Sequence, residues 1–403
     1  MYLYISFTTF LSCRSTDSFS IDVKRQTEKK DAQEQDTFTD TDEEDTSDTD
    51  TLPIDSGEDP LYEAENTTLN RYHLVNAQER NAVCNDGSAP VYYYKEGSGE
   101  GKNKWLIWLQ GGAGCATPEE CALRELSTPE LMSSIHHVGQ PVYETNGVFV
   151  EDSQISPEFH NWTKVFLCYC SSDHWSGNRS AEETGDYHFR GHNILNGFLE
   201  DLSNPELFPN INLTQAQELL IGGNSAGALG LQINIDRVAD IYSEIPIKGY
   251  FDSHFKPLVM LEREIQLGFN DETVEFLNQK IEYQGLIPDE TCAAQETEIV
   301  RCFQPYLQPY IETPYFVLMD QYDFMCSTTT GAVQLGYFQD AMSSTQGRFA
   351  PAENIHVWSN ISQFYLHQVQ GYSGLNLLEN WYFQRDELQT MVDPIQFNGC
   401  DDL

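Results

Sequence analysis

The sequence contains few basic residues for its length. Its 403 residues include 22 lysines and arginines against 63 aspartates and glutamates, so the formal net charge at pH 7 is −41. This charge repels phosphate groups, which argues against a nucleic-acid-binding protein and against electrostatic attachment to anionic lipid.

Long apolar runs and zinc-binding spacings are also missing. The sequence has no stretch of about 18 consecutive apolar residues, so we expect no membrane-spanning segment. It has no HExxH pattern, which argues against a metallohydrolase of that kind. With 40% hydrophobic and 12% aromatic residues the chain can build a large core. We therefore expect it to need no metal and no cofactor.

Cysteine, by contrast, is abundant. Ten cysteines are more than a typical cytosolic enzyme contains. Two pairs have separations that suit short disulfide loops, Cys115 with Cys121 and Cys292 with Cys302. We expect the chain to mature in an oxidising compartment and the protein to be secreted, extracellular or at the cell surface.

The first 60 residues differ in composition from the remainder. Residues 1–15 contain MYLYISFTTFLSC, a short apolar segment that resembles an export signal without its usual basic start. The end of this segment also resembles a lipoprotein processing site, at which Cys13 would carry a lipid anchor, although we favour an ordinary leader. Residues 16–60 are acidic and rich in Thr and Asp, which predicts a disordered linker because little apolar surface is available to offset the entropy of ordering.

The folded domain is expected over residues 61–403. Short apolar runs alternate there with helix-length segments, which is typical of a mostly parallel sheet flanked by crossover helices. The expected strands are 91–94, 105–109, 165–169, 218–222, 247–251, 315–319 and 355–358. An amphipathic helix is predicted from Ala228, Leu231, Ile235, Val238 and Tyr242. Residues 254–314 are too long for a simple connection and predict a helical cap insertion.

Ser225 lies in a glycine-rich turn between an expected strand and this helix. Residues 223–227 read GNSAG, the GxSxG spacing of a nucleophilic serine. A strand that passes into a helix within so few residues turns sharply, and glycine avoids the collisions that a Cβ would cause. The helix N-terminus beneath Ser225 would stabilise an anion through its N–H groups. We predict Ser225 as a catalytic nucleophile, and the alternative is a serine that only caps the helix.

A second glycine-rich turn follows the strand expected over 105–109. In WLIWLQGGAGC the N–H groups of Gly112 and Ala113, together with that of Ala226, are suited to bind a tetrahedral oxyanion. The alternative is a flexible hairpin turn. A short disulfide loop formed by Cys115 and Cys121 argues against that alternative, because it would stiffen the turn.

Chain order narrows the choice of acid and base. In hydrolases with this type of serine turn, the acid follows the serine and the histidine follows the acid, each after a later strand. Asp320 and Asp323 follow the strand expected over 315–319, and we favour Asp323 because it lies a few residues beyond the strand end. His356 falls inside an expected strand, whereas His367 falls in the loop beyond it. We therefore favour His367 as the base.

Several segments together resemble the motif blocks of the pectinacetylesterase and Notum family of carboxylesterases. They are WLIWLQGGAGC, CYCSSDHWSGNRS, IGGNSAGALGLQINIDRVAD, FDSHF and YFVLMDQYD. The resemblance implies an α/β-hydrolase fold and a catalytic triad that maps onto Ser225, Asp323 and His367. It also implies oxyanion donors at Gly112, Ala113 and Ala226, and the disulfides Cys84–Cys170 and Cys115–Cys121.

One departure from that family affects the expected substrate. Ala113 and Gly114 stand where Notum enzymes carry bulky aromatic residues, so the wall of the acyl pocket is not the same. We expect a secreted serine carboxylesterase, acting as a monomer, that removes acetyl groups from a polysaccharide or a related ester. Neutral glycans remain open, because so acidic a chain gains no long-range attraction to polygalacturonate. The alternatives are a Notum-like deacylase of a lipidated protein and a non-catalytic hydrolase-like binding module.

The segment SSDHWSGNR allows two interpretations. Trp175 could line the mouth of the active site and stack on a sugar ring, or it could brace the loop after the strand expected over 165–169. For Asp173 we favour the structural role.

Overall fold

The computed structural model describes residues 67–145, 147–253, 270–303, 307–319, 347–350, 368–385 and 389–392. The predicted leader with Cys13, the acidic linker, Asp320, Asp323, His356, His367 and the strand expected over 355–358 lie outside these residues.

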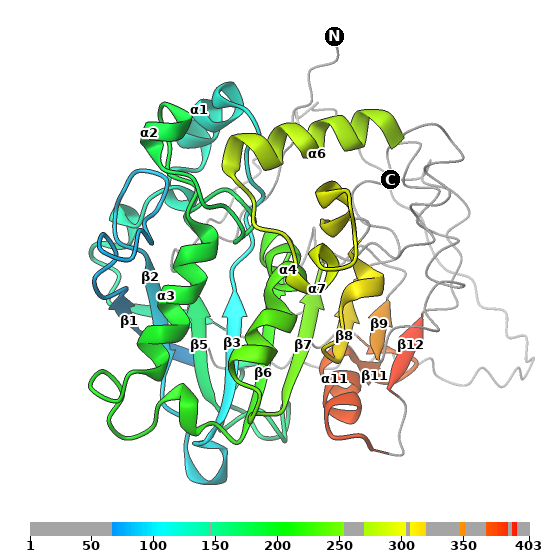
Figure 1. The fold of residues 1–403 in the computed structure, drawn as a ribbon. Coiled ribbons are helices and arrows are strands. Elements are labelled where there is room, and N and C mark those ends of the chain that lie inside the picture. The colour runs from blue at the N-terminus through cyan, green and yellow to red at the C-terminus, as the bar shows by residue number, and fades with distance from the viewer. Residues whose placement is uncertain are drawn as a thin grey trace, which may run out of the picture. The chain divides into compact units, whose positions relative to one another are not determined.

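The described residues form a ten-stranded sheet in the order β12-β9-β8-β7-β6-β3-β5-β2-β1-β4 (Figure 1). The strands are β1 (Thr67–His73), β2 (Val91–Lys95), β3 (Lys104–Leu109), β4 (Val142–Thr145), β5 (Thr163–Leu167), β6 (Glu218–Asn224), β7 (Ile247–Asp252), β8 (Tyr315–Leu318), β9 (Arg348–Ala350) and β12 (Thr390–Val392). From β12 to β5 all pairings are parallel, whereas β2, β1 and β4 pair antiparallel. A separate hairpin pairs β10 (Gln368–Val369) with β11 (Tyr372–Ser373).

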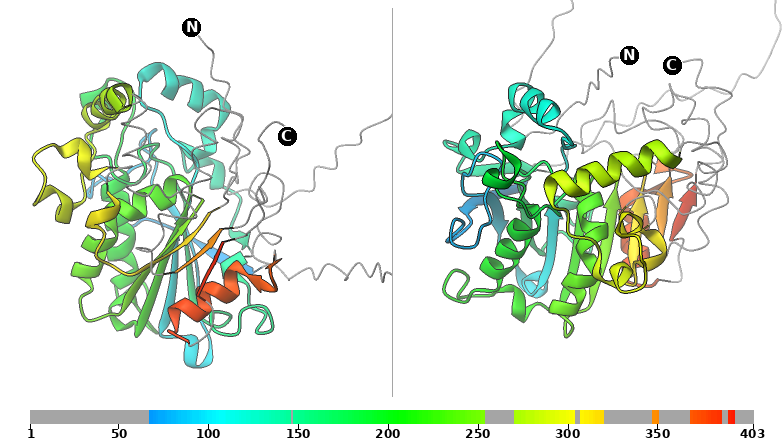
Figure 2. Two further views of the ribbon diagram at one scale, coloured as in Figure 1. Left: turned by 90° about the vertical axis from the view of Figure 1, so that its right-hand side faces the viewer. Right: turned by 45° about the horizontal axis from the view of Figure 1, so that its top comes forward.

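Helices cover both faces of the sheet. The α-helices are α1 (Pro118–Ser127), α2 (Ala181–Thr184), α3 (Gly191–Ser203), α4 (Ala226–Ile241), α6 (Asn270–Gln284), α7 (Glu290–Ala293) and α11 (Gly374–Tyr382). Short 3-10 helices span Gly99–Gly101, Pro129–Leu131, Ile135–His137, Gly147–Phe149, Leu213–Gln215, Ile299–Cys302 and Gln308–Tyr310. Figures 1 and 2 show α3 and α4 on one face of the sheet and α11 on the other.

The core has two layers because alternate side chains of each strand point to opposite faces. On β3, Trp105 and Ile107 pack with α3 and α4, whereas Leu106 and Trp108 pack in the layer that contains α11. Both layers are buried, which explains why the central parallel strands appear in the sequence as uninterrupted apolar runs.

The described part of the predicted cap insertion is helical. Helices α6 and α7 lie between β7 and β8 in the chain, and the Cys292–Cys302 disulfide packs against Ile233 of α4 in a small apolar cluster. In Figure 1 and in the right panel of Figure 2, α6 runs beyond the carboxyl ends of the parallel strands. Parallel α/β sheets bind their ligands at that end.

Candidate active site

The turn between β6 and α4 holds Ser225 in an unusual backbone conformation. Its φ is 50° and its ψ is −117°, a conformation that costs a side-chain-bearing residue free energy. Ser225 occupies the N-cap position of α4, but its side chain accepts no capping hydrogen bond and is partly exposed. The alternative that this serine only caps the helix is therefore wrong.

Glycines allow three chain segments to meet at this turn. A Cβ on Gly223 would lie 2.7 Å from the carbonyl carbon of Gly227, so the end of β6 and the first turn of α4 can approach only without it. A Cβ on Gly227 would collide with the carbonyl oxygen of Leu109. The N-terminus of α4 therefore sits directly against the end of β3.

The loop after β3 is tied to the serine turn by Asn224. The Asn224 Oδ1 atom accepts hydrogen bonds from the Gly111 N–H and from the Trp108 Nε1–H, both at 3.1 Å. A Cβ on Gly111 would collide with the Asn224 carbonyl oxygen. The residues just before Gly112 and Ser225 are thus held together by one side chain.

Some of the backbone N–H groups near Ser225 have no partner among the described residues, as is normal in the first turn of a helix. They include those of Gly112, Ala113 and Ala226, the residues expected to bind an oxyanion. The φ angles of Gly112 and Ala113 are 136° and 53°, so the chain turns twice through the left-handed region and does not continue β3. In an oxyanion hole, backbone N–H groups have no protein partner and are free to donate to the charged oxygen of the substrate.

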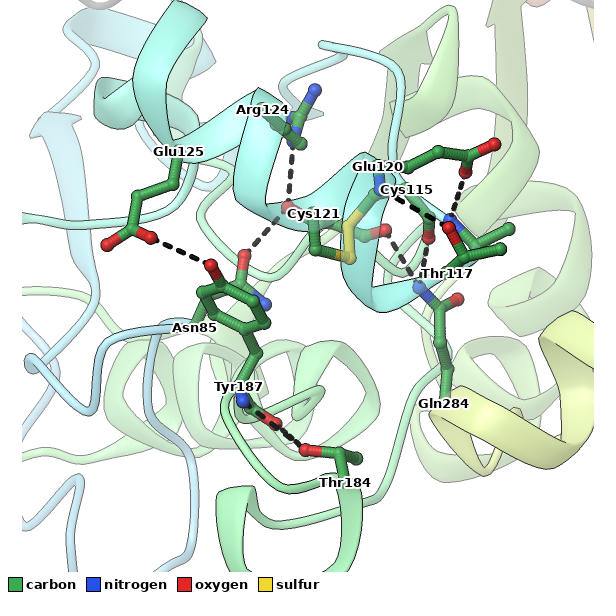
Figure 3. Close-up of a disulfide and its surroundings, with 12 residues drawn as sticks. Asn85, Cys115, Thr117, Glu120, Cys121, Arg124, Glu125, Thr184, Tyr187 and Gln284 are labelled. Atoms are coloured by element: carbon green, nitrogen blue, oxygen red, sulfur yellow. Dashed lines mark hydrogen bonds between the residues drawn. A yellow bond between two sulfur atoms is a disulfide. The ribbon is translucent and has the colours of Figure 1, made fainter.

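One disulfide and α1 lie at the far end of this loop, as Figure 3 shows. Cys115 is bonded to Cys121, the Thr117 side chain caps α1, and Gln284 of α6 donates a hydrogen bond of 2.5 Å to the Cys115 carbonyl oxygen. The structure also contains Cys84–Cys170 and Cys292–Cys302, so all three pairs expected from the sequence are present.

The loop after β5 is held by a buried carboxylate. Asp173 accepts hydrogen bonds from the Ser171 hydroxyl at 2.6 Å, from the Trp175 N–H at 3.0 Å and from the Gly191 N–H at 2.7 Å. Burial raises the pKa of Asp173 to about 6, although these hydrogen bonds oppose that shift. The expected structural role of Asp173 agrees with this arrangement.

Trp175 does not line the mouth of the site. Its side chain is 0% exposed, its ring stacks on Tyr169, and its Nε1–H donates to the Gln110 carbonyl oxygen at 3.1 Å. No face of the ring is open to a sugar. The interpretation of Trp175 as a residue that stacks on a sugar is therefore wrong. Trp175 supports the loop after β3 through its hydrogen bond to Gln110.

Sequence reasoning missed the contacts that the cap makes with the site. Lys280 of α6 is buried, and its Nζ lies 3.0 Å from Nδ1 of His174. A Cβ on Gly114 would lie 3.1 Å from the other ring nitrogen of His174, so this histidine lies against the loop that carries the unpaired N–H groups. Burial lowers the pKa of Lys280 to about 8.

Asp252 is a carboxylate beside the serine turn that received no role in the sequence analysis. It ends β7, it is buried, and its carbonyl oxygen accepts the Ser225 N–H at 2.9 Å. Its carboxylate accepts the Ser253 hydroxyl at 2.6 Å. The pairing of β6 with β7, which a local sequence pattern does not reveal, places it there.

Neither a metal-binding cluster nor a membrane-spanning helix is found within the described ranges. No cluster of three or more His, Cys, Asp or Glu side chains is arranged there to hold a metal ion. In the same ranges, none of the helices has the length and apolar character needed to cross a bilayer.

The sheet order and the serine turn define a protein of the α/β-hydrolase fold. The crystal structure of the Wnt deacylase Notum from Drosophila superposes with a TM-score of 0.65 at 22% identity, covering 82% of this chain and 98% of that one. The fold predicted from the sequence is confirmed. The chain belongs to the pectinacetylesterase family, whose model matches residues 62–339.

Relatives from both branches of the family are similar to this chain. Palmitoleoyl-protein carboxylesterase notum1 of Xenopus laevis is 31% identical over 268 residues, which are 63% of this chain and 51% of the relative. Pectin acetylesterase 5 of Arabidopsis thaliana is 32% identical over 254 residues, 62% of this chain and 56% of the relative. The chain thus spans about half the length of these two relatives, and the predicted family is confirmed.

Proposed function

We propose that this protein is a serine carboxylesterase in which Ser225 attacks the ester carbonyl. The N–H groups of Gly112, Ala113 and Ala226 then stabilise the oxyanion. The backbone of Ser225 carries the proposal: a strained residue that caps nothing, at the N-terminus of α4, is suited to nucleophilic attack.

The mechanism is a two-step acyl transfer. His367 takes the Ser225 proton, the alkoxide attacks, and the alcohol leaves with a proton from His367. Water, activated by the same histidine, releases the acid from the acyl-enzyme. Asp323 orients His367 and stabilises its charged form. The roles of Asp323 and His367 rest on the family resemblance and on chain order.

The substrate that we propose is an acetylated polysaccharide or a related ester. Ala113 and Gly114 leave the loop without the bulky side chains of the Notum branch, and relatives named as pectin acetylesterases match this chain as well as Notum enzymes do. The three disulfides support an enzyme that acts outside the cell. Deacylation of a lipidated protein is the second candidate, because one of the relatives is named palmitoleoyl-protein carboxylesterase.

The first test replaces Ser225 with alanine. Ser225→Ala should lower kcat on p-nitrophenyl acetate by several orders of magnitude and abolish labelling by a fluorophosphonate probe, because the nucleophile is gone. Ser127→Ala, an exposed serine at the end of α1, should behave as the wild type. If Ser225→Ala kept the wild-type rate, the assignment would be wrong; a wild-type protein that neither hydrolyses nor reacts with the probe would be a binding module.

The substrate class is tested separately. Release of free acid is measured from a panel that runs from acetylated glycans to long-chain acyl esters. Preference for short acyl groups supports the proposed substrate, and preference for long chains favours the deacylase.

A further inference from the structure

Arg124 of α1 is a buried cation that faces the loop after β3. Only 6% of the residue is exposed. Its Nη2 donates a hydrogen bond of 2.6 Å to the Gly112 carbonyl oxygen, and its Nε donates one of 2.8 Å to the Ser172 hydroxyl. The guanidinium thus joins the loop after β3 to the loop after β5.

The rest of this network is polar but uncharged. The Ser172 hydroxyl donates to Asn85 Oδ1 at 2.7 Å, which leaves its lone pairs for Arg124. The Asn85 amide in turn donates to the carbonyl oxygens of Ser171 and His188. Among the described residues no carboxylate lies within ion-pair distance of Arg124.

Such a buried charge is costly for stability. A guanidinium removed from water without a paired carboxylate loses hydration that two neutral hydrogen-bond acceptors replace only in part. Burial accordingly lowers the pKa of Arg124. An apolar side chain would fill this position at lower cost, so the hydrogen bond to the loop is the feature that explains an arginine here.

Peptide geometry connects Arg124 with the expected oxyanion donor. The Gly112 carbonyl and the Ala113 N–H belong to one planar peptide unit, and in the trans form they point in opposite directions. Fixing the carbonyl on Arg124 therefore turns the Ala113 N–H away from Arg124, where it has no partner among the described residues. A charged donor on the carbonyl also polarises the peptide and strengthens its N–H as a donor.

We propose that Arg124 is a positioning residue of the oxyanion hole, which holds the Gly112–Ala113 peptide so that the Ala113 N–H faces the charge formed during ester hydrolysis. This inference rests on the proposed esterase function. Arg124 acts through the peptide and does not contact the substrate.

The test compares Arg124→Met, which keeps most of the apolar stem, with Arg124→Lys. On p-nitrophenyl acetate, kcat per fluorophosphonate-titrated active site should fall about 10- to 100-fold for Arg124→Met, less than the 10²–10³-fold loss of a removed donor. KM should change little. An aryl trifluoromethyl ketone, whose adduct places an oxyanion in the same hole, should bind more weakly by a similar factor. Arg124→Lys should lie between, because it keeps the charge without the planar fork.

Arg237→Met is the matched control. Arg237 is a partly buried arginine whose guanidinium likewise donates to neutral groups, Asn196 and Asn234. It lies about three helical turns from Ser225 along α4. The kcat of Arg237→Met and its affinity for the ketone should equal those of the wild type. A lower kcat for the Arg124 variants with unchanged ketone affinity would overturn the proposal, since a merely structural defect lowers turnover without weakening oxyanion binding at titrated sites. A wild-type protein without esterase activity would instead reject the proposed function.

Discussion

At the scale of single residues, Ser225 shows how strain marks a site. A residue with a Cβ at this φ and ψ costs on the order of 1–3 kcal/mol, which its surroundings must offset. The hydrogen bond from its N–H to Asp252 and the glycine contacts at residues 223 and 227 hold the turn in place. Glycine would adopt the conformation at lower cost, so the hydroxyl accounts for serine at this position.

The choice of acid is tested by two matched substitutions. Asp323→Asn should lower kcat on p-nitrophenyl acetate on the order of 10⁴-fold, because an amide favours the wrong histidine tautomer and does not stabilise the imidazolium. Asp320→Asn should keep most of the activity. The opposite ranking would transfer the role to Asp320, and wild-type rates in both variants would direct attention to the buried Asp252.

At the scale of elements, α6 connects the cap to the loops after β3 and β5. Two side chains one turn apart lie on the same side of this helix and contact these loops. Gln284 donates to the carbonyl oxygens of Cys115 and Ser172, and Lys280 contacts His174. Residues 115, 172 and 174 flank the loop with the unpaired N–H groups, so docking of α6 bears on the shape of the site.

Burial of Lys280 predicts a pH dependence of stability. Its pKa is about 8 in the folded protein and 10.5 in the reference state, so between these values the unfolded chain binds a proton that the folded protein does not. The free energy of unfolding should therefore rise through this window. From urea denaturation, the wild type should gain roughly 2 kcal/mol relative to Lys280→Met between pH 7.5 and 9.5. Parallel pH profiles for the two proteins would contradict the prediction.

At the scale of the whole molecule, the disulfides differ in what they constrain. Cys84–Cys170 closes a separation of 86 residues and joins the region before β2 to the segment after β5. Cys115–Cys121 closes only 6 residues, directly after the loop of unpaired N–H groups. The first bond therefore restricts the unfolded chain far more, whereas the second lies beside the site.

Removing each bond should separate stability from activity. By chain entropy, Cys84→Ala/Cys170→Ala should cost roughly 4–5 kcal/mol of unfolding free energy, and Cys115→Ala/Cys121→Ala roughly 2 kcal/mol. The kcat per titrated active site should fall more in the second variant, because the loop loses its anchor. Denaturant titration compares the unfolding free energies of the two variants, and esterase assays compare their kcat. If the same variant lost more of both, the two disulfides would not differ in role as proposed.

Elements with a strong local pattern could be predicted from the sequence. The apolar runs and the helical periodicity correctly predicted strands β2, β3, β6, β7 and β8 and helix α4. Most side chains of these elements are buried, so their own residues carry the pattern. Strands β1, β4, β9 and β12 were missed. They lie toward the two edges of the sheet, and β1, with the sequence TTLNRYH, becomes a strand through its pairing with β2 and β4. Strand β5 ends at Leu167 and not at Tyr169, whose N–H donates to the Gln110 side chain.

The class of fold and the position of the serine turn could be predicted from the sequence, because hydrophobic periodicity and glycine spacing are local properties of the chain. The family was predicted from the resemblance of its motif blocks. Tertiary packing, by contrast, buries Trp175, brings Arg124 to the Gly112 carbonyl, and brings Lys280 and Gln284 of the cap to the loops after β3 and β5. The contacts of the cap join residues more than a hundred positions apart. Which side chains meet at such separations depends on how strands and helices pack, and no local pattern encodes it.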